Sequence, residues 1–360
     1  MPPRSPGKFW RQAFAVRPAV QPWPLSVCAA IAVGLPVAVA VAIGEGALGA
    51  LAALGAMVIL HRPASGERAP ATVMGLCAMA VTASMVLGIG LGDWPTVVPL
   101  LFGALVAAIV AATRLANLPA PGHTLFVLAA SSGAAAGFHP ERLPAIVIAT
   151  LSGAALSILL VAAASRWPIG KTLDLPAGSA AAAAPPAPCS LAAEAGIFGL
   201  FAGGSLAIAQ ALGLERPYWV PISCIAIMRG ITLQSVWTRN LQRIAGTALG
   251  IAATTAILFF EPPAALACAL IALLAFGLHH TTARNYAITV LFGTPLSLLL
   301  TELASLNLVP DNALMMARIE DIVLGSSIGL AGGALLQLRV LRRGGMRPGD
   351  PHAPRDGSPG

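Results

Sequence analysis

Twelve long runs of apolar residues dominate the sequence and leave little polar sequence between them. A helix that crosses a bilayer needs about 20 mostly apolar residues. These runs are continuous, whereas strands of a membrane barrel alternate in polarity over about ten residues. The sequence therefore predicts an all-α, polytopic membrane protein with about 12 transmembrane helices. The predicted spans are 25–44, 47–61, 70–91, 95–113, 123–137, 143–164, 191–212, 217–231, 240–260, 262–279, 283–303 and 318–340.

The composition of the chain excludes a soluble globular protein and a disordered chain. Hydrophobic residues make up 57% of the chain and charged residues 10%, against about 25% charged residues in a soluble domain. A disordered chain needs the reverse balance. Three predicted spans, 47–61, 123–137 and 217–231, are short, and whether they cross the bilayer completely is left open because a mismatch in length costs little.

The basic residues are distributed unequally between the two ends of the predicted spans. If the first span leaves from the cytoplasm, Arg142, Arg216 and Arg318 lie outside and the remaining 18 of the 21 Lys and Arg residues lie inside. This is the positive-inside pattern of membrane proteins. We therefore predict that both termini are cytoplasmic. The net charge of +7 follows from this topology, and binding to nucleic acid is not needed to explain it.

Two similar halves are indicated by short internal matches. The segment RLPAIVIATLSGAA (142–155) resembles RIEDIVLGSSIGLA (318–331), and RAPATVMG (68–75) aligns with RNLQRIAG (239–246). We interpret the chain as two six-helix repeats of parallel orientation. The predicted parts are a cytoplasmic N-terminal tail (1–24), the first six-helix repeat (25–164), a Pro- and Ala-rich cytoplasmic linker (165–190), the second repeat (191–343) and a disordered cytoplasmic tail (344–360).

The segment 217–250 carries the most specific motif. It reads PYWVPISCIAIMRGITLQSVWTRNLQRIAGTALG, in which an aromatic pair opens a short helix and R-x-x-G-T-x-x-G starts the next. It resembles the fusaric acid resistance-like (FUSC) family of integral membrane transporters, within the aromatic acid exporter superfamily. The segment RIEDIVLGSSIG (318–329) is similar to the end of the same module. Many larger members carry a big cytoplasmic domain after each set of six spans, and here only the linker and the tail occupy those places.

The resemblance implies a multi-pass protein of the bacterial inner membrane that exports small organic acids, often aromatic, as anions driven by an electrochemical gradient. A passive organic-anion channel of the same fold is the alternative. A membrane subunit of a larger complex and a lipid-modifying membrane enzyme are further alternatives. A carrier would give saturating flux that responds to a pH gradient, whereas a channel would give ohmic current.

The sequence contains no Walker A motif for ATP hydrolysis and no HExxH motif for zinc. We therefore expect no enzymatic activity, no cofactor and no metal. The expected partners are a small organic anion and the lipid bilayer, with no nucleic acid. A homo-oligomer remains an alternative to a monomer.

An organic anion needs cationic groups along its path, and arginine binds a carboxylate through two parallel hydrogen bonds. Arg243 is the first candidate because it belongs to the R-x-x-G-T motif and lies deepest. Thr247 follows one turn later. The full set of candidate substrate-binding residues is Arg243, Arg239, Arg229, Thr247, Arg68, Asn285 and Tyr286. The alternative interpretation is that these arginines anchor helix ends to lipid phosphates.

Three further residues are candidates for proton coupling. His279 and His280 stand beside a predicted span, and histidine changes charge near neutral pH. Asp321 opens the last predicted span. An ion pair with Arg318, three residues earlier, is the structural alternative for this carboxylate.

Overall fold

The computed structural model describes residues 15–16, 22–63, 69–91, 96–118, 121–137, 139–166, 188–229, 233–282, 284–304 and 312–343. Within these ranges the regular secondary structure is entirely helical, which confirms the all-α prediction. The α-helices are α2 (Trp23–Ala42), α3 (Gly46–Ala56), α4 (Pro70–Leu91), α5 (Val98–Leu115), α6 (Thr124–Ala136), α7 (Leu143–Arg166), α8 (Pro188–Ala211), α9 (Trp219–Met228), α10 (Leu233–Phe259), α11 (Ala264–Thr281), α12 (Tyr286–Ala304) and α13 (Asn312–Arg343). Two short 3-10 helices, η1 (Met57–His61) and η2 (Pro140–Arg142), follow α3 and precede α7.

In the described part of the chain, nine helices are long and apolar enough to cross a membrane. The three shorter apolar helices are α3 with η1, α6 and α9. They coincide with the three short predicted spans, so complete crossing by these segments stays a prediction. Several predicted features lie outside the described residues. They are most of the predicted linker, the predicted tail 344–360, most of 1–24 and the candidate Arg68.

Two helices begin earlier than hydropathy predicts. Helix α10 begins at Leu233 instead of 240, and α13 begins at Asn312 instead of 318. Hydropathy locates the apolar stretch, but polar residues such as Gln234 are good helix formers and extend the helix beyond it. As a result Arg243 and Asp321 lie further inside their helices than the sequence predicts.

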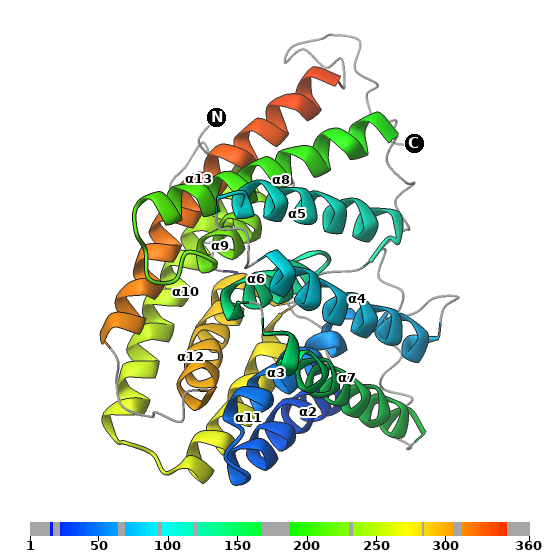
Figure 1. Cartoon of the computed structure of the whole chain (residues 1–360), viewed down its shortest axis with the longest axis vertical. Helices are drawn as coiled ribbons and strands as arrows, with labels where there is room; N and C mark the ends of the chain where they lie inside the picture. Colours follow the sequence, from blue (N-terminus) through cyan, green and yellow to red (C-terminus); the bar gives the residue numbers. More distant parts are fainter. Residues whose placement is uncertain are drawn as a thin grey trace, which may run out of the picture.

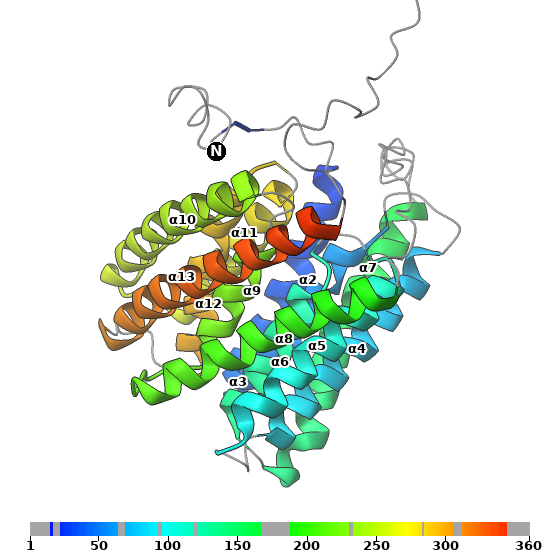
Figure 2. The ribbon, with the colours of Figure 1, turned by 90° about the horizontal axis from the view of Figure 1, so that it is seen from above.

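The contacts among α2 to α7 recur among α8 to α13. Helix α4 packs on α6 and α3 on α7, as α10 packs on α12 and α9 on α13. Between the two sets, α5 packs on α8 and α2 on α11. Figure 1 shows these two pairs on opposite sides of the molecule, with α6 and α9 near its centre. Viewed from above, the axes of α8, α10 and α13 are nearly parallel, and α13 runs opposite to α8 and α10 (Figure 2).

Glycine allows the paired helices to approach closely, as small residues do in membrane proteins. A Cβ on Gly325 would lie 2.5 Å from the carbonyl oxygen of Val220, and one on Gly329 would lie 2.6 Å from that of Cys224. The residue numbers of these contacts increase in the same direction along both helices, so α13 runs parallel to α9. In the first set, Gly153 of α7 lies still closer to the backbone of Ala52 in α3.

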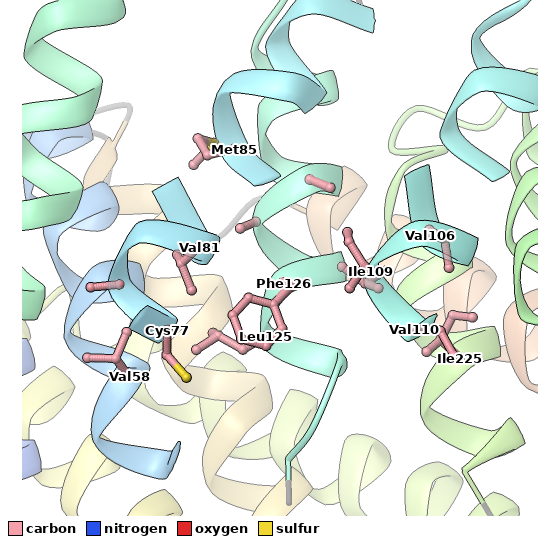
Figure 3. Close-up of a cluster of buried hydrophobic side chains, with 14 of the residues drawn as sticks. Val58, Cys77, Val81, Met85, Val106, Ile109, Val110, Leu125, Phe126 and Ile225 are labelled. Atoms are coloured by element: carbon pink, nitrogen blue, oxygen red, sulfur yellow. The ribbon is translucent and has the colours of Figure 1, made fainter. Parts of the chain in front are cut away.

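The largest apolar cluster surrounds α6. Figure 3 shows Phe126 of α6 with Cys77 and Val81 of α4 on one side and Ile109 of α5 on the other. Ile225 of α9 belongs to the same cluster. This packing holds α6 and α9 together at the centre of the molecule.

Large apolar side chains also lie on the outer surface of the helices. Leu100, Leu249 and Phe259 are each at least 60% exposed. An extended apolar exterior is expected where a protein faces lipid tails instead of water. The exterior and the nine long helices together indicate a multi-pass membrane protein.

Candidate functional site

Arg243 of α10 lies at the centre of a buried polar network. Its side chain is 6% exposed. One terminal nitrogen donates a hydrogen bond to the hydroxyl of Ser223 in α9 at 2.7 Å, and the other donates to the hydroxyl of Tyr286 in α12 at 3.0 Å. Arg243 stands ten residues after the first residue of α10, which is about 15 Å along the helix axis. Three helices therefore contribute to the surroundings of this guanidinium.

Asp321 of α13 joins the same network and is 1% exposed. One carboxylate oxygen accepts a hydrogen bond from the hydroxyl of Ser223, and the other accepts from Arg318 at 2.9 Å. The ion pair between Arg318 and Asp321, one of the alternatives from sequence, is thus present in the structure. Through Ser223, the carboxylate is also connected to Arg243.

The two charged residues reach the network from opposite ends of the bundle. The guanidinium of Arg239 donates to the carbonyl oxygen of Ala226, and Arg243 reaches back to Ser223. The later residue of α10 thus contacts the earlier residue of α9. Helix α10 is therefore antiparallel to α9, whereas α13 is parallel to it. Asp321 stands nine residues from the start of α13, which is about 14 Å. Both charges therefore lie near the middle of the bundle.

Two arginine–aromatic stacks flank this network. The guanidinium of Arg239 lies 4.1 Å from the ring centroid of Tyr286, and that of Arg318 lies 5.1 Å from the ring centroid of Trp219. A guanidinium over an aromatic face is stabilised by the ring quadrupole. Because Tyr286 and Trp219 belong to α12 and to the start of α9, one stack lies on each side of Ser223.

Arg229 connects this region to the first set of helices. It follows the last residue of α9 and donates a hydrogen bond to the hydroxyl of Thr124, the first residue of α6, at 2.9 Å. The side chain of Arg229 is half-buried. The cationic region around α9 therefore extends to the boundary between the two sets of helices.

The charges of the network are not balanced within the described residues. Arg229, Arg239, Arg243 and Arg318 surround α9, and the ion pair formed by this group is that of Arg318 with Asp321. The Nε atoms of Arg243 and Arg318 and the hydroxyl of Thr247 are buried without a hydrogen-bond partner in this part of the chain. Buried polar groups almost always have partners. These buried polar atoms are therefore candidates for a further hydrogen-bonding partner.

The structure brings together most of the residues that the sequence predicted to bind substrate. Arg239, Arg243 and Tyr286 are in direct contact, and Asp321 joins them through Ser223. Thr247 follows Arg243 by one turn of α10 and is buried. Tyr286 was predicted as a substrate-binding residue and Asp321 as a proton-coupling residue, and the packing of α12 on α10 and of α13 on α9 places them in one network.

The described hydrogen bonds of Asn285 are not to the residues of the polar network around Arg243. Its side-chain oxygen accepts a hydrogen bond from the backbone of Ala287 at the start of α12, and its amide donates to the carbonyl oxygen of Ala15. With Gly246 and Leu249 it also lines a mostly apolar pocket of about 260 Å³ between α10 and α12. The described contacts thus give Asn285 a helix-capping role.

The two histidines lie in helix α11, not in a loop beside it. The Nδ1 atoms of His279 and His280 lie 3.1 and 3.4 Å from the hydroxyl of Ser26 in α2. His279 is 1% exposed, and the ring of His280 stacks on Phe276. These residues join α11 to α2, and a role in proton coupling stays a prediction.

Three residues of the candidate site carry no signal in the sequence that predicts their role. Ser223 is the link between Arg243 and Asp321, but a single serine in an apolar helix gives no distinctive pattern. Trp219 occupies a helix end, where tryptophan is expected at any membrane interface. Thr124 precedes an apolar run and its contact with Arg229 spans 105 residues.

Comparison with known proteins supports the resemblance seen in the sequence. Residues 203–332 match the family model described as fusaric acid resistance protein-like. A stretch of 140 residues is 39% identical to the uncharacterized membrane protein YvaC of Bacillus subtilis (strain 168). That stretch is 39% of this chain and 22% of YvaC, so the chain covers less than a quarter of that relative. No solved structure matches the chain. Arg243, Tyr286 and Asp321 therefore all lie within residues 203–332, the segment that is similar to the fusaric acid resistance protein-like family.

Proposed function

We propose that the protein exports small organic acids, aromatic acids among them, as anions across the bacterial inner membrane. The observation that carries this proposal is the group of four arginines around α9, which meets one carboxylate, that of Asp321, among the described ion pairs. Charges within a membrane protein are expensive and usually mark a substrate or ion path. Guanidinium groups are well suited to carboxylates because they remain charged and offer paired donors.

Aromatic substrates fit the same region. The rings of Tyr286 and Trp219 lie against Arg239 and Arg318 at the two sides of the network. An aromatic acid presents both groups for which this arrangement has partners, a carboxylate for an arginine and a ring for offset stacking. Aliphatic acids lack the second interaction, so we expect them to be transported less efficiently.

We further propose that the two sets of helices are repeats related by an axis along the membrane normal, with the transport path at their boundary. The recurring helix contacts support this proposal, and Arg229 lies at the boundary. The internal alignment places Thr72 opposite Arg243 and Ala145 opposite Asp321. Both charges are lacking at the matching positions, so the second repeat supplies the charged site.

The membrane potential provides a driving force for this direction of transport. It is negative inside and favours exit of an anion by about 2.3 kcal/mol per charge per 100 mV. The uneven distribution of Lys and Arg supports a cytoplasmic location for both termini. Because the membrane potential can drive the exit of an anion, we propose a transporter that needs no nucleotide as its energy source and has no enzymatic activity.

A growth assay tests the proposal. The full chain is produced in an efflux-deficient bacterium challenged with a panel of aromatic and aliphatic weak acids. Arg243→Ala and Arg114→Ala are compared with the wild type at equal membrane levels. Arg114 is the control because its ion pair with Glu194 is at the surface. We expect protection by the wild type and Arg114→Ala and loss of protection by Arg243→Ala.

Each other result has a definite meaning. Lack of protection against every acid contradicts export, and equal protection by Arg243→Ala removes this arginine from the path. Flux measured in liposomes then separates the carrier from the passive channel. Saturation with a response to a pH gradient indicates the carrier, and ohmic current that is insensitive to the gradient indicates the channel.

A further inference from the structure

Asp321 uses both of its carboxylate oxygens to hold the cations of the site. One oxygen accepts a hydrogen bond from the hydroxyl of Ser223, and this hydroxyl accepts one from Arg243. The other oxygen accepts a hydrogen bond from Arg318. Because the side chain is 1% exposed, these interactions are shielded from water and are stronger than they would be at a surface. The carboxylate therefore pairs directly with Arg318 and is linked to Arg243 through the hydroxyl of Ser223.

The same arginines keep capacity for a second carboxylate. The Nε atoms of Arg243 and Arg318 and the hydroxyl of Thr247 have no partner among the described residues. Arg243 is 6% exposed and Thr247 is 3% exposed, so these groups are almost fully buried. A carboxylate accepts several hydrogen bonds on its two oxygens. It could thus take up donors that Asp321 leaves unused.

We propose that Asp321 is an internal competitor for the transported anion, which must displace its carboxylate from Arg318 and from the hydroxyl of Ser223 that links it to Arg243. This inference rests on the proposed function and adds a residue that sets the affinity of its site. Two carboxylates at one cluster of arginines repel each other. Asp321 therefore weakens the binding of the substrate and assists its release, since transport requires a site that an anion can also leave.

The competition has consequences for substitutions at two positions. Asp321→Asn keeps the shape of the side chain and removes its charge, so both arginines become available to an added anion. Ser223→Ala keeps every charge and removes the hydroxyl that connects Asp321 to Arg243. Both variants should therefore bind anions more tightly than the wild type. A carboxylate that only stabilises the fold gives the opposite expectation, because its loss would loosen the site.

Binding is measured on the purified full chain by titrating benzenesulfonate and following the shift of the thermal unfolding midpoint. Benzenesulfonate is an aromatic anion that stays ionised at neutral pH, so its own charge does not vary during the titration. A ligand that binds the folded state raises this midpoint with its concentration. Glu320→Gln is the matched control, since Glu320 is the adjacent acid on α13 and is only partly buried.

We expect Asp321→Asn to lower the apparent Kd for benzenesulfonate by about tenfold and Ser223→Ala by about threefold, since a tenfold change corresponds to one well-formed charged interaction. Glu320→Gln should bind as the wild type does. Unchanged or weaker binding by Asp321→Asn overturns the proposal. If that variant does not fold, Ser223→Ala decides, because it leaves the charges of the buried site intact. Lack of binding by every folded protein also overturns the proposal.

This result is separable from the test of export. Tighter binding by Asp321→Asn without growth protection by the wild type contradicts export and leaves Asp321 as a competitor at an anion site. Protection by the wild type with unchanged binding by both variants contradicts the competitor and leaves export intact.

Discussion

The guanidinium of Arg239 lies 4.1 Å from the ring centroid of Tyr286, whose hydroxyl accepts a hydrogen bond from Arg243. One tyrosine thus binds two cations, with its face and with its oxygen. The two contacts differ in kind, because the first needs only the ring and the second needs only the hydroxyl. Substitutions can therefore separate them.

Tyr286→Phe keeps the ring and removes the hydroxyl. We expect transport to fall by about threefold to tenfold, because a typical intramolecular hydrogen bond contributes about 0.5–1.5 kcal/mol net. Tyr286→Leu should reduce transport by about tenfold more, since the stack with Arg239 is also lost. Uptake of a labelled aromatic acid into inside-out vesicles measures both. Tyr218→Phe is the control at the other tyrosine of the chain, and a loss as large as that of Tyr286→Phe would contradict the assignment.

Tight contact between helices predicts that Gly153 cannot be enlarged. A Cβ at Gly153 would collide with the backbone of Ala52 in α3, so Gly153→Ala should reduce the free energy of unfolding by about 1–3 kcal/mol. At Gly196 of α8 a Cβ meets nothing within 4 Å, and Gly196→Ala should be neutral or stabilise the helix by about 0.5–1 kcal/mol. Thermal unfolding in detergent compares the two variants. Equal stability would show that α3 and α7 are not packed as described.

The hydrogen bond from Arg229 to Thr124 predicts coupling between the two sets of helices. A double-mutant cycle with Arg229→Gln and Thr124→Ala should give a coupling free energy of about 0.5–3 kcal/mol, as expected for residues in contact away from bulk water. The exposed pair of Arg114 with Glu194 provides a comparison, with an expected coupling of about 0–1 kcal/mol. Unfolding monitored by intrinsic fluorescence gives both values. Additive effects at Arg229 and Thr124 would contradict the contact.

The distribution of basic residues predicts the topology. Alkaline phosphatase fused after residue 216 should be active, because the α8–α9 turn is predicted to lie outside and the enzyme folds only there. Fusions after residues 166 and 343 should be inactive, whereas green fluorescent protein at these positions should fluoresce. Fusions of each reporter at all three positions are measured in whole cells. Active phosphatase after residue 343 would reverse the predicted location of the C-terminus.

Most of the helices could be predicted from the sequence because transfer from water to lipid depends on the local stretch of chain. Residues 70–91 were predicted as a span and form α4 over the same residues. The starts of α10 and α13 were placed too late, because polar residues in a helix lower the mean hydropathy without ending the helix. Hydropathy therefore locates the apolar part of a helix better than its ends.

The sequence alone also singled out Arg243, Arg239, Tyr286 and Asp321, because charged and polar groups are rare in such apolar surroundings. It could not show that they meet. Their contacts join four helices, and the partners of Ser223 stand 20 and 98 residues away along the chain. Only the packing of α10 and α13 on the short helix α9, and of α12 on α10, decides those distances. The local sequence thus determined which buried positions carry charge, and tertiary packing determined that Arg318 pairs with Asp321 and that Ser223 links this pair to Arg243.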